Sequence, residues 1–196
     1  MKLDDLFTEE AKKAIKETLD VSDKKSLNES FAAQPKQFSL KTDFLSPSNV
    51  QNHIELYDNY VQDFNKVGAQ LDSVDKSEVN SNHSAFRSLK IDETYNMNAA
   101  YLHELYFANI GDANSRISMD SLSYMRLNRD FGTFDDWQRD FIACGMSSRC
   151  GWAVTYLNIY TQSYMNCVVD LHSQNVPAGM YPVIVMDLWQ HAYYRD

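Results

Sequence analysis

The chain has 196 residues, of which 44% are hydrophobic and 13% aromatic, a globular composition with room for one substantial core or two small subdomains. Its formal net charge of −9 argues against a general nucleic-acid binder, which would carry a clustered basic face. The first residues lack a basic and apolar leader, and no apolar run reaches the roughly 18 residues of a membrane span. We therefore expect a soluble cytoplasmic protein without nucleic-acid or membrane partners.

The cysteine content gives no sign of a disulfide framework. Three cysteines cannot all pair within one chain, and none belongs to a C-x-x-C unit of the kind that binds zinc. We expect reduced thiols that are not metal ligands: Cys144, Cys150 and Cys167.

The first 36 residues are predicted to form an arm and a linker. Residues 8–19 begin with a threonine that can cap a helix, and their apolar residues recur every four positions, which predicts a short amphipathic helix. Residues 21–36 are polar and read as a linker. An arm with so narrow an apolar stripe is either a frayed tail or a docking element for a partner.

Residues 37–113 are predicted to be a helical half. Ser46 can cap a long helix whose first residue is Pro47. The apolar stripe of this helix has spacings of three and four residues and comprises His53, Leu56, Tyr57, Tyr60, Phe64 and Val67. After a polar connection over 74–83, a second helix is expected from about Ala85 and a third over 101–107, followed by a loop over 111–115.

Residues 114–196 are predicted to be an α+β half. A helix over 118–130 should end at Gly132, and Thr133 should cap the next helix. Segments 152–160 and 164–171 are rich in β-branched and aromatic residues, which indicates paired strands, and 183–186 supplies a third strand. The expected fold class is therefore α+β, with a helical hairpin followed by a small antiparallel sheet.

Two pairs of side chains could together bind a metal ion. Asp187 and His191 lie four residues apart and share one face if a helix begins there, and the helical half offers His53 and His103. Three histidines and an aspartate suit iron or manganese, or zinc on ligand type alone. The alternative for the C-terminal pair is an aspartate that caps a helix and a histidine buried in the core.

Several motifs in residues 37–196 resemble those of the iron/manganese superoxide dismutases. The run from Asp187 to Tyr194 resembles their signature D-x-W-E-H-A-Y-Y. The segment from Leu45 resembles their first ligand helix, with His53 eight residues after the leading aliphatic residue. Residues 98–107 resemble the second ligand helix, with Phe107 in place of the usual tryptophan, and residues 131–156 resemble the F-G-S-F-x-x-W and G-W motifs.

This resemblance implies a function and a role for each site residue. One iron or manganese ion per chain would be held by His53, His103, Asp187 and His191, and would convert superoxide to oxygen and hydrogen peroxide. The family also uses a Gln or His that bonds the metal-bound solvent. His172 lies fifteen residues before Asp187, as in members that use His, and is preferred over Gln174.

The resemblance assigns three further residues, and spacing leaves one histidine outside the site. Tyr60 matches the gateway tyrosine of the family, although the segment between it and His53 is one residue shorter than usual. Trp152 and Trp189 would exclude water. His83 lies in the polar connection and is expected to be exposed.

Two departures from the family pattern leave a second function open. Gln190 replaces the glutamate that normally reaches the partner's ligand histidine across the dimer, and the sequence ends at Asp196, where a further helical stretch with an arginine is expected. The chain is thus either an active dismutase, extended at its N-terminus and shortened at its C-terminus, or a structural subunit of a large assembly such as a virus particle. A homo-oligomer or larger assembly would form through the arm.

Overall fold

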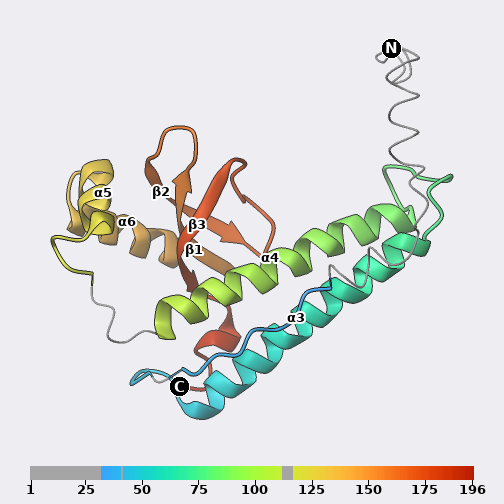
Figure 1. Cartoon of the computed structure of the whole chain (residues 1–196), viewed down its shortest axis with the longest axis horizontal. Helices are drawn as coiled ribbons and strands as arrows, with labels where there is room; N and C mark the ends of the chain where they lie inside the picture. The colour runs from blue at the N-terminus through green and yellow to red at the C-terminus, as the bar shows by residue number, and fades with distance from the viewer. Residues whose placement is uncertain (1–31, 41, 112–116) are drawn as a thin grey trace. The chain divides into compact units, whose positions relative to one another are not determined.

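The computed structural model describes residues 32–40, 42–111 and 117–196 (Figure 1). The predicted helix over 8–19, most of the predicted linker and most of the predicted loop over 111–115 lie outside these residues. The described elements are α3 (Pro47–Ser73), α4 (Ala85–Gly111), α5 (Leu122–Phe131), α6 (Phe134–Ser147), β1 (Gly151–Asn158), β2 (Tyr164–Asp170), β3 (Met180–Asp187) and the short 3₁₀ helix η2 (Gln190–Ala192).

Helix α3 begins where the sequence predicted. The Oγ of Ser46 accepts a hydrogen bond from the backbone N–H of Asn49 at 3.2 Å, and Pro47 occupies the first helical position. Such a cap satisfies one of the N–H groups that a helix leaves unpaired at its start. The buried residues of α3 are Asn49, His53, Tyr57, Val61, Val67 and Leu71.

Helix α4 is continuous from Ala85 to Gly111, so the prediction of two separate helices here was wrong. The segment has no proline, and its only glycine is its last residue, so nothing in the backbone breaks it. Asn96, a weak helix former, donates its side-chain amide to the carbonyl of Asp92 in the preceding turn at 2.8 Å. His103 therefore sits in the second half of one long helix.

Helices α5 and α6 meet at the predicted break. Gly132 follows α5 with a φ of 91°, a conformation that glycine adopts without strain. Thr133 then caps α6, with its Oγ1 accepting from the N–H of Asp136 at 3.0 Å. The start of α5 was predicted too early, because Ser121 rather than a residue near Ser118 provides the cap.

The three predicted strands form one antiparallel sheet in the order β2-β1-β3. Strand β3 begins at Met180, before the predicted Val183. In its register with β1, Trp152 lies opposite Asp187. The side-chain amide of Asn109 on α4 pairs with the free edge of β3, donating to the carbonyl of Val183 and accepting from the N–H of Val185. The α+β fold class and the three predicted strands are confirmed.

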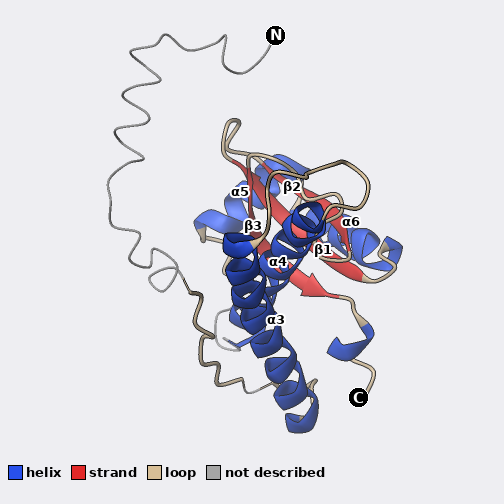
Figure 2. Ribbon diagram, turned by 90° about the vertical axis from the view of Figure 1, so that its right-hand side faces the viewer, coloured by secondary structure: helices blue, strands red, loops and turns tan. Residues whose placement is uncertain are grey.

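Helix α4 lies between α3 and the sheet (Figure 2), while α6 packs against β1 and β2. The main core forms where α3, α4 and the sheet meet, and it includes Tyr57, Phe107, Trp152 and Val185. This core surrounds the predicted ligands. In the part of the chain that the structure describes, no helix combines the length and low polarity needed to cross a membrane.

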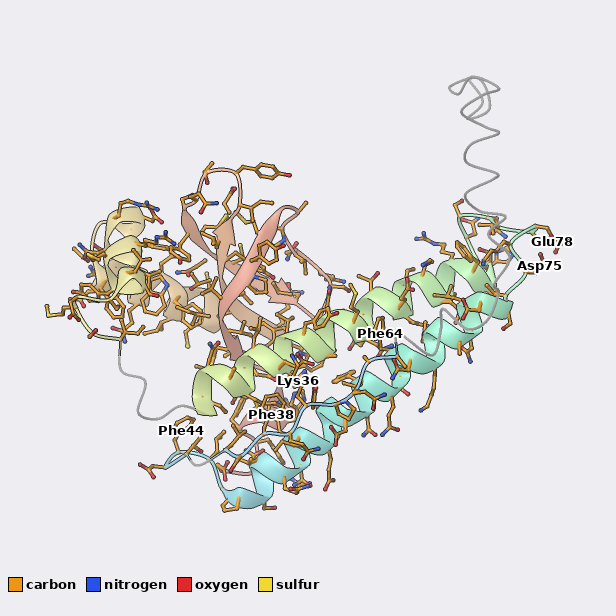
Figure 3. The ribbon with its side chains drawn as sticks, in the orientation of Figure 1. Lys36, Phe38, Phe44, Phe64, Asp75 and Glu78 are labelled. Carbon is orange, nitrogen blue, oxygen red and sulfur yellow. The ribbon has the colours of Figure 1, made fainter. Side chains whose placement is uncertain are left out.

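An extended segment over residues 33–40, which we call the strap, runs alongside α3 (Figure 1). The N–H of Ala33 donates to Asn65 Oδ1 at 2.9 Å, and the N–H of Lys36 donates to the hydroxyl of Tyr57 at 2.9 Å. Lys36 also forms an ion pair with Glu104 on α4, and Phe38 packs on Tyr57 and Phe107. Figure 3 labels these two side chains of the strap, Lys36 and Phe38. Residues 33–36, which sequence analysis placed in the linker, therefore contact both long helices.

Candidate metal centre

Four side chains from three parts of the fold converge on one point. His53 comes from α3, His103 from α4, and Asp187 and His191 from the end of β3 and from η2. One ligand atom from each lies within 4.8 Å of the others. The Oδ2 atom of Asp187 is central: the Nε2 atoms of the histidines lie 3.1 Å (His53), 3.2 Å (His191) and 3.6 Å (His103) from it.

Asp187 and His191 share a face without the α-helix that the sequence suggested. Asp187 is the last residue of β3, and its Oδ1 accepts the N–H of Trp189 at 2.8 Å. This local bond turns the chain into the 3₁₀ helix over Gln190–Ala192, which returns His191 to Asp187. The spacing of four residues was therefore informative, although the helix that brings the two side chains together is a short 3₁₀ helix that begins after Asp187.

The orientation of His103 is set by its own helix. Its Nδ1 lies 2.7 Å from the carbonyl of Ala99, and because a carbonyl can only accept, Nδ1 must carry the hydrogen. Nε2 is then a bare acceptor, fully buried and without a hydrogen-bond partner among the residues that the structure describes. An unpaired buried acceptor is destabilising, and a cation at the cluster would satisfy it. Burial also lowers the pKa of His103 to about 3, so the ring stays neutral as a metal ligand must.

Asp187 is held in its ionised form. Burial by itself raises the pKa of Asp187, but hydrogen bonds to His191 and His53 outweigh burial and keep this pKa below the usual range. The side chains of His53, His103 and Asp187 are buried, whereas that of His191 is 27% exposed. The cluster thus brings one negative charge and three imidazoles together, a donor set that fits a divalent or trivalent ion.

A second group of side chains forms a hydrogen-bonded chain beside the cluster. The indole Nε1–H of Trp152 donates to His172 Nδ1 at 3.0 Å. Because an indole can only donate, the hydrogen of His172 must lie on Nε2, which therefore donates to the hydroxyl oxygen of Tyr60 at 3.1 Å. Burial lowers the pKa of His172 to about 4, so the ring is neutral near pH 7. The rings of Tyr60 and His103 lie 5.3 Å apart, which places this chain next to a ligand.

The structure separates the two candidates that sequence analysis took from the segment after β2. His172 is fully buried at the cluster. Gln174 is exposed in the turn that follows, where its N–H bonds the carbonyl of Asp170, and the structure does not bring its side chain to the site. His83 is also exposed, in the connection between α3 and α4.

Two tryptophans line the cluster as expected. Trp152 is fully buried and its ring meets that of His103 edge to face at 4.9 Å. Trp189 is partly buried and stacks on His172 at 5.0 Å and on His191 at 5.8 Å. Gln190, the residue that departs from the family signature, is exposed on η2.

Comparison with known proteins identifies the family. A profile described as "Iron/manganese superoxide dismutases, C-terminal domain" matches residues 121–196. An iron superoxide dismutase of Aquifex pyrophilus is 31% identical over 156 residues, covering 78% of this chain and 72% of the relative, and that of Aquifex aeolicus matches equally. A manganese superoxide dismutase of Haloferax volcanii is 27% identical over 146 residues, covering 74% of this chain and 70% of the relative. The chain belongs to the iron/manganese superoxide dismutase family.

Family membership confirms the resemblance inferred from the motifs. The matched profile includes Trp152, His172, Asp187 and His191. Relatives named for iron and relatives named for manganese are both similar to this chain, so the comparison supports either metal.

Two aromatic residues at the site were not predicted from the sequence. The ring of Tyr95 lies 4.7 Å from that of His172, and the ring of Tyr106 lies 5.3 Å from that of His53. Tyr95 was assigned to a different helix from His103. Reading Ala85–Gly111 as one uninterrupted helix would have placed Tyr95 about two turns before His103, and so within reach of the site.

Proposed function

We propose that this protein is a superoxide dismutase that holds one iron or manganese ion per chain at His53, His103, Asp187 and His191. The observation that carries the proposal is the convergence of their ligand atoms within 4.8 Å, with His103 Nε2 buried and unpaired. Imidazole nitrogens and a carboxylate oxygen, without a thiolate, match the ligand preference of these ions. The names of the relatives agree with this assignment.

When bound, the ion supplies one-electron chemistry by alternating between its divalent and trivalent states. The net reaction converts two superoxide anions and two protons into one molecule of oxygen and one of hydrogen peroxide.

The chain's own residues hold the donor atoms ready. Asp187 Oδ1 is occupied by the N–H of Trp189 and His103 Nδ1 by the carbonyl of Ala99, so each side chain has one atom left for the cluster. Fixing a ligand through its second atom reduces the rotamer freedom lost on binding.

Tyr60 is positioned to hold a proton beside the site. Its oxygen accepts from His172 Nε2, and its hydroxyl is also hydrogen-bonded to that of Tyr95. Burial raises the pKa of Tyr60 above its usual range, so the proton stays on this oxygen near neutral pH. Trp152 and Trp189 limit the water that reaches the cluster, which strengthens the electrostatic interactions within it.

Metal content and activity test the proposal together. Full-length protein should contain about one iron or manganese ion per chain by elemental analysis, and should dismute superoxide after reconstitution with one of these metals. Zinc alone, or no metal after reconstitution, would reject the metal assignment. Bound iron or manganese without dismutation would reject the activity.

The alternative is a protein that keeps the dismutase fold as a structural subunit of a large assembly, for instance a virus particle. The exposed Gln190 in place of the family glutamate favours this alternative. It predicts defined assemblies whose formation does not require metal, and little or no dismutation, so the same purified protein discriminates between the two functions.

A further inference from the structure

A buried amide lies one helical turn before the ligand His53. Asn49, on the first turn of α3, is 1% exposed. Its Nδ2 donates to the carbonyl of Ala192 at 3.1 Å and to Asp196 Oδ2 at 2.7 Å, while its Oδ1 is buried without a partner in the described part of the chain. The unpaired oxygen of a buried amide lowers the stability of the fold, so stability alone does not explain why an asparagine lies here.

Both acceptors belong to the segment that follows the ligand His191. Ala192 is the next residue and is itself buried, at 2% exposure. Asp196 also accepts the N–H of Ser46 through both carboxylate oxygens, each at 3.2 Å. The start of α3 therefore holds residues 192–196 through Asn49 and Ser46.

His191 depends on such an anchor more than the other ligands do. His53 and His103 stand on long helices, whereas His191 lies in a 3₁₀ helix of three residues and is the most exposed of the ligand side chains. Before η2, the chain is fixed by the bond from Trp189 N–H to Asp187 Oδ1. After His191, the side-chain bond from Asn49 to the Ala192 carbonyl fixes it to α3.

We propose that Asn49 is a positioning residue that places His191 for metal binding, by tying the carbonyl next to His191 to the helix that carries His53. This inference rests on the metal binding proposed above but not on dismutation. The C-terminal signature supplies Asp187 and His191, whereas Asn49 lies outside it, on the helix that carries His53.

The decisive variant is Asn49→Asp, which keeps the shape of the side chain but replaces its donor with an oxygen that repels the Ala192 carbonyl and the Asp196 carboxylate. The matched control is Asn52→Asp on the same helix, because the bond that Asn52 donates goes to the carbonyl of Ser48 in its own helix. The measurements are the dissociation rate of Mn²⁺ in the presence of a chelator and the melting temperature with and without Mn²⁺.

Asn49→Asp should release Mn²⁺ about tenfold faster than the wild type, the usual scale for residues that orient a ligand, while Asn52→Asp stays within about twofold. The increase in melting temperature on adding Mn²⁺ should shrink only in Asn49→Asp. An equal loss of melting temperature with and without Mn²⁺, at an unchanged release rate, would show a purely structural role and overturn the inference.

A second variant decides the matter if Asn49→Asp does not fold. Asn49→Ala removes the donor to the Ala192 carbonyl without adding a charge, and should also speed Mn²⁺ release; an unchanged rate would overturn the inference. A wild type that binds no Mn²⁺, Fe²⁺ or Fe³⁺ would instead reject the proposed metal site.

Discussion

At the scale of single residues, the cluster is defined by which atoms are already engaged. His103 and Asp187 each use one polar side-chain atom in a hydrogen bond to a neighbouring backbone group, and the other polar atom faces the cluster. His53 and His191 contact the same carboxylate oxygen at 3.1 and 3.2 Å. The four side chains are thus oriented by the protein itself, and removing any one of them should affect metal binding directly.

We expect Asp187→Ala and His103→Ala each to weaken iron or manganese binding by more than about 100-fold, beyond the effect of residues that only orient ligands. Asp187→Ala removes the negative charge and the shared acceptor of His53 and His191. Isothermal titration with Mn²⁺ measures the loss. His83→Ala, at an exposed histidine outside the cluster, is the control. Comparable weakening in all three variants would mean general destabilisation rather than lost ligation.

Because His103 and His172 are buried, we expect the metal-free protein to lose stability in acid. The pKa of His103 is lowered to about 3 and that of His172 to about 4, against 6.5 for an exposed histidine. Between about pH 6.5 and 4 the unfolded chain therefore takes up protons that the native state does not. As the pH is lowered through this window, the free energy of unfolding should decrease by up to about 1.4 kcal/mol per pH unit for each histidine. Above about pH 6.5, these two histidines should not contribute to the pH dependence of stability.

Urea unfolding of the metal-free protein at a series of pH values tests this expectation. His172→Gln keeps a polar side chain but removes one titrating group, so the slope below about pH 6.5 should drop by roughly half. A variant with the same slope as the wild type would show that His172 does not contribute.

At the scale of elements, adding a side chain at two glycines should have opposite effects on stability. These are Gly151 at the start of strand β1 and Gly68 within helix α3. Gly151 begins β1, and a Cβ there would lie 2.0 Å from the carbonyl oxygen of Val169 on β2. The added Cβ and the carbonyl oxygen of Val169 are both fixed by the backbone of their strands, so rotating a side chain cannot relieve the contact. Gly68 lies within α3, and a Cβ there would meet no atom of residues 32–40, 42–111 or 117–196 within 4 Å.

Gly151→Ala should therefore destabilise the protein by about 3 kcal/mol or more, because the β1–β2 pair must separate to accept the methyl group. Gly68→Ala should stabilise it by about 0.5 to 1 kcal/mol, since alanine loses less backbone freedom in a helix. Denaturant unfolding of both variants provides the comparison. A neutral Gly151→Ala would show that the strand pair is looser than the structure describes.

At the scale of the whole molecule, residues 33–196 form one compact unit. Its core draws α3, α4 and the sheet together around the cluster, and the strap packs on that core through Phe38 and Leu40. The structural boundary of this body therefore lies before residue 33, and any test of the preceding arm must leave the strap in place.

We expect deletion of residues 1–32 to leave the melting temperature within a few degrees of the wild type but to reduce the size of any oligomer, because a short amphipathic helix needs a surface to bury its apolar stripe. Deletion of residues 1–38 is the comparison. It also removes Phe38 and the contacts of Ala33 and Lys36, and should cost roughly 1 to 2 kcal/mol. Calorimetry and light scattering measure both effects. Unchanged oligomer size after the shorter deletion would exclude the arm as an assembly element.

The sequence by itself determined the features that depend on neighbouring residues. The caps at Ser46 and Thr133, the break at Gly132 and the three strands follow from hydrogen bonds and periodicity that act over a few positions. The C-terminal signature likewise led to the family, because the whole run from Asp187 to Tyr194, and not the Asp187–His191 pair alone, matches its pattern.

Only the tertiary structure decided which of the candidate side chains meet. The family resemblance favoured His172 over Gln174, but the contact that distinguishes them, from His172 to Tyr60, joins residues 112 positions apart and arises only in the fold. In the same way, the link from Asn49 to Ala192 spans 143 positions and leaves no local pattern. Such contacts depend on the packing of α3 and α4 against the end of β3, and no rule of spacing or propensity within one segment contains that information.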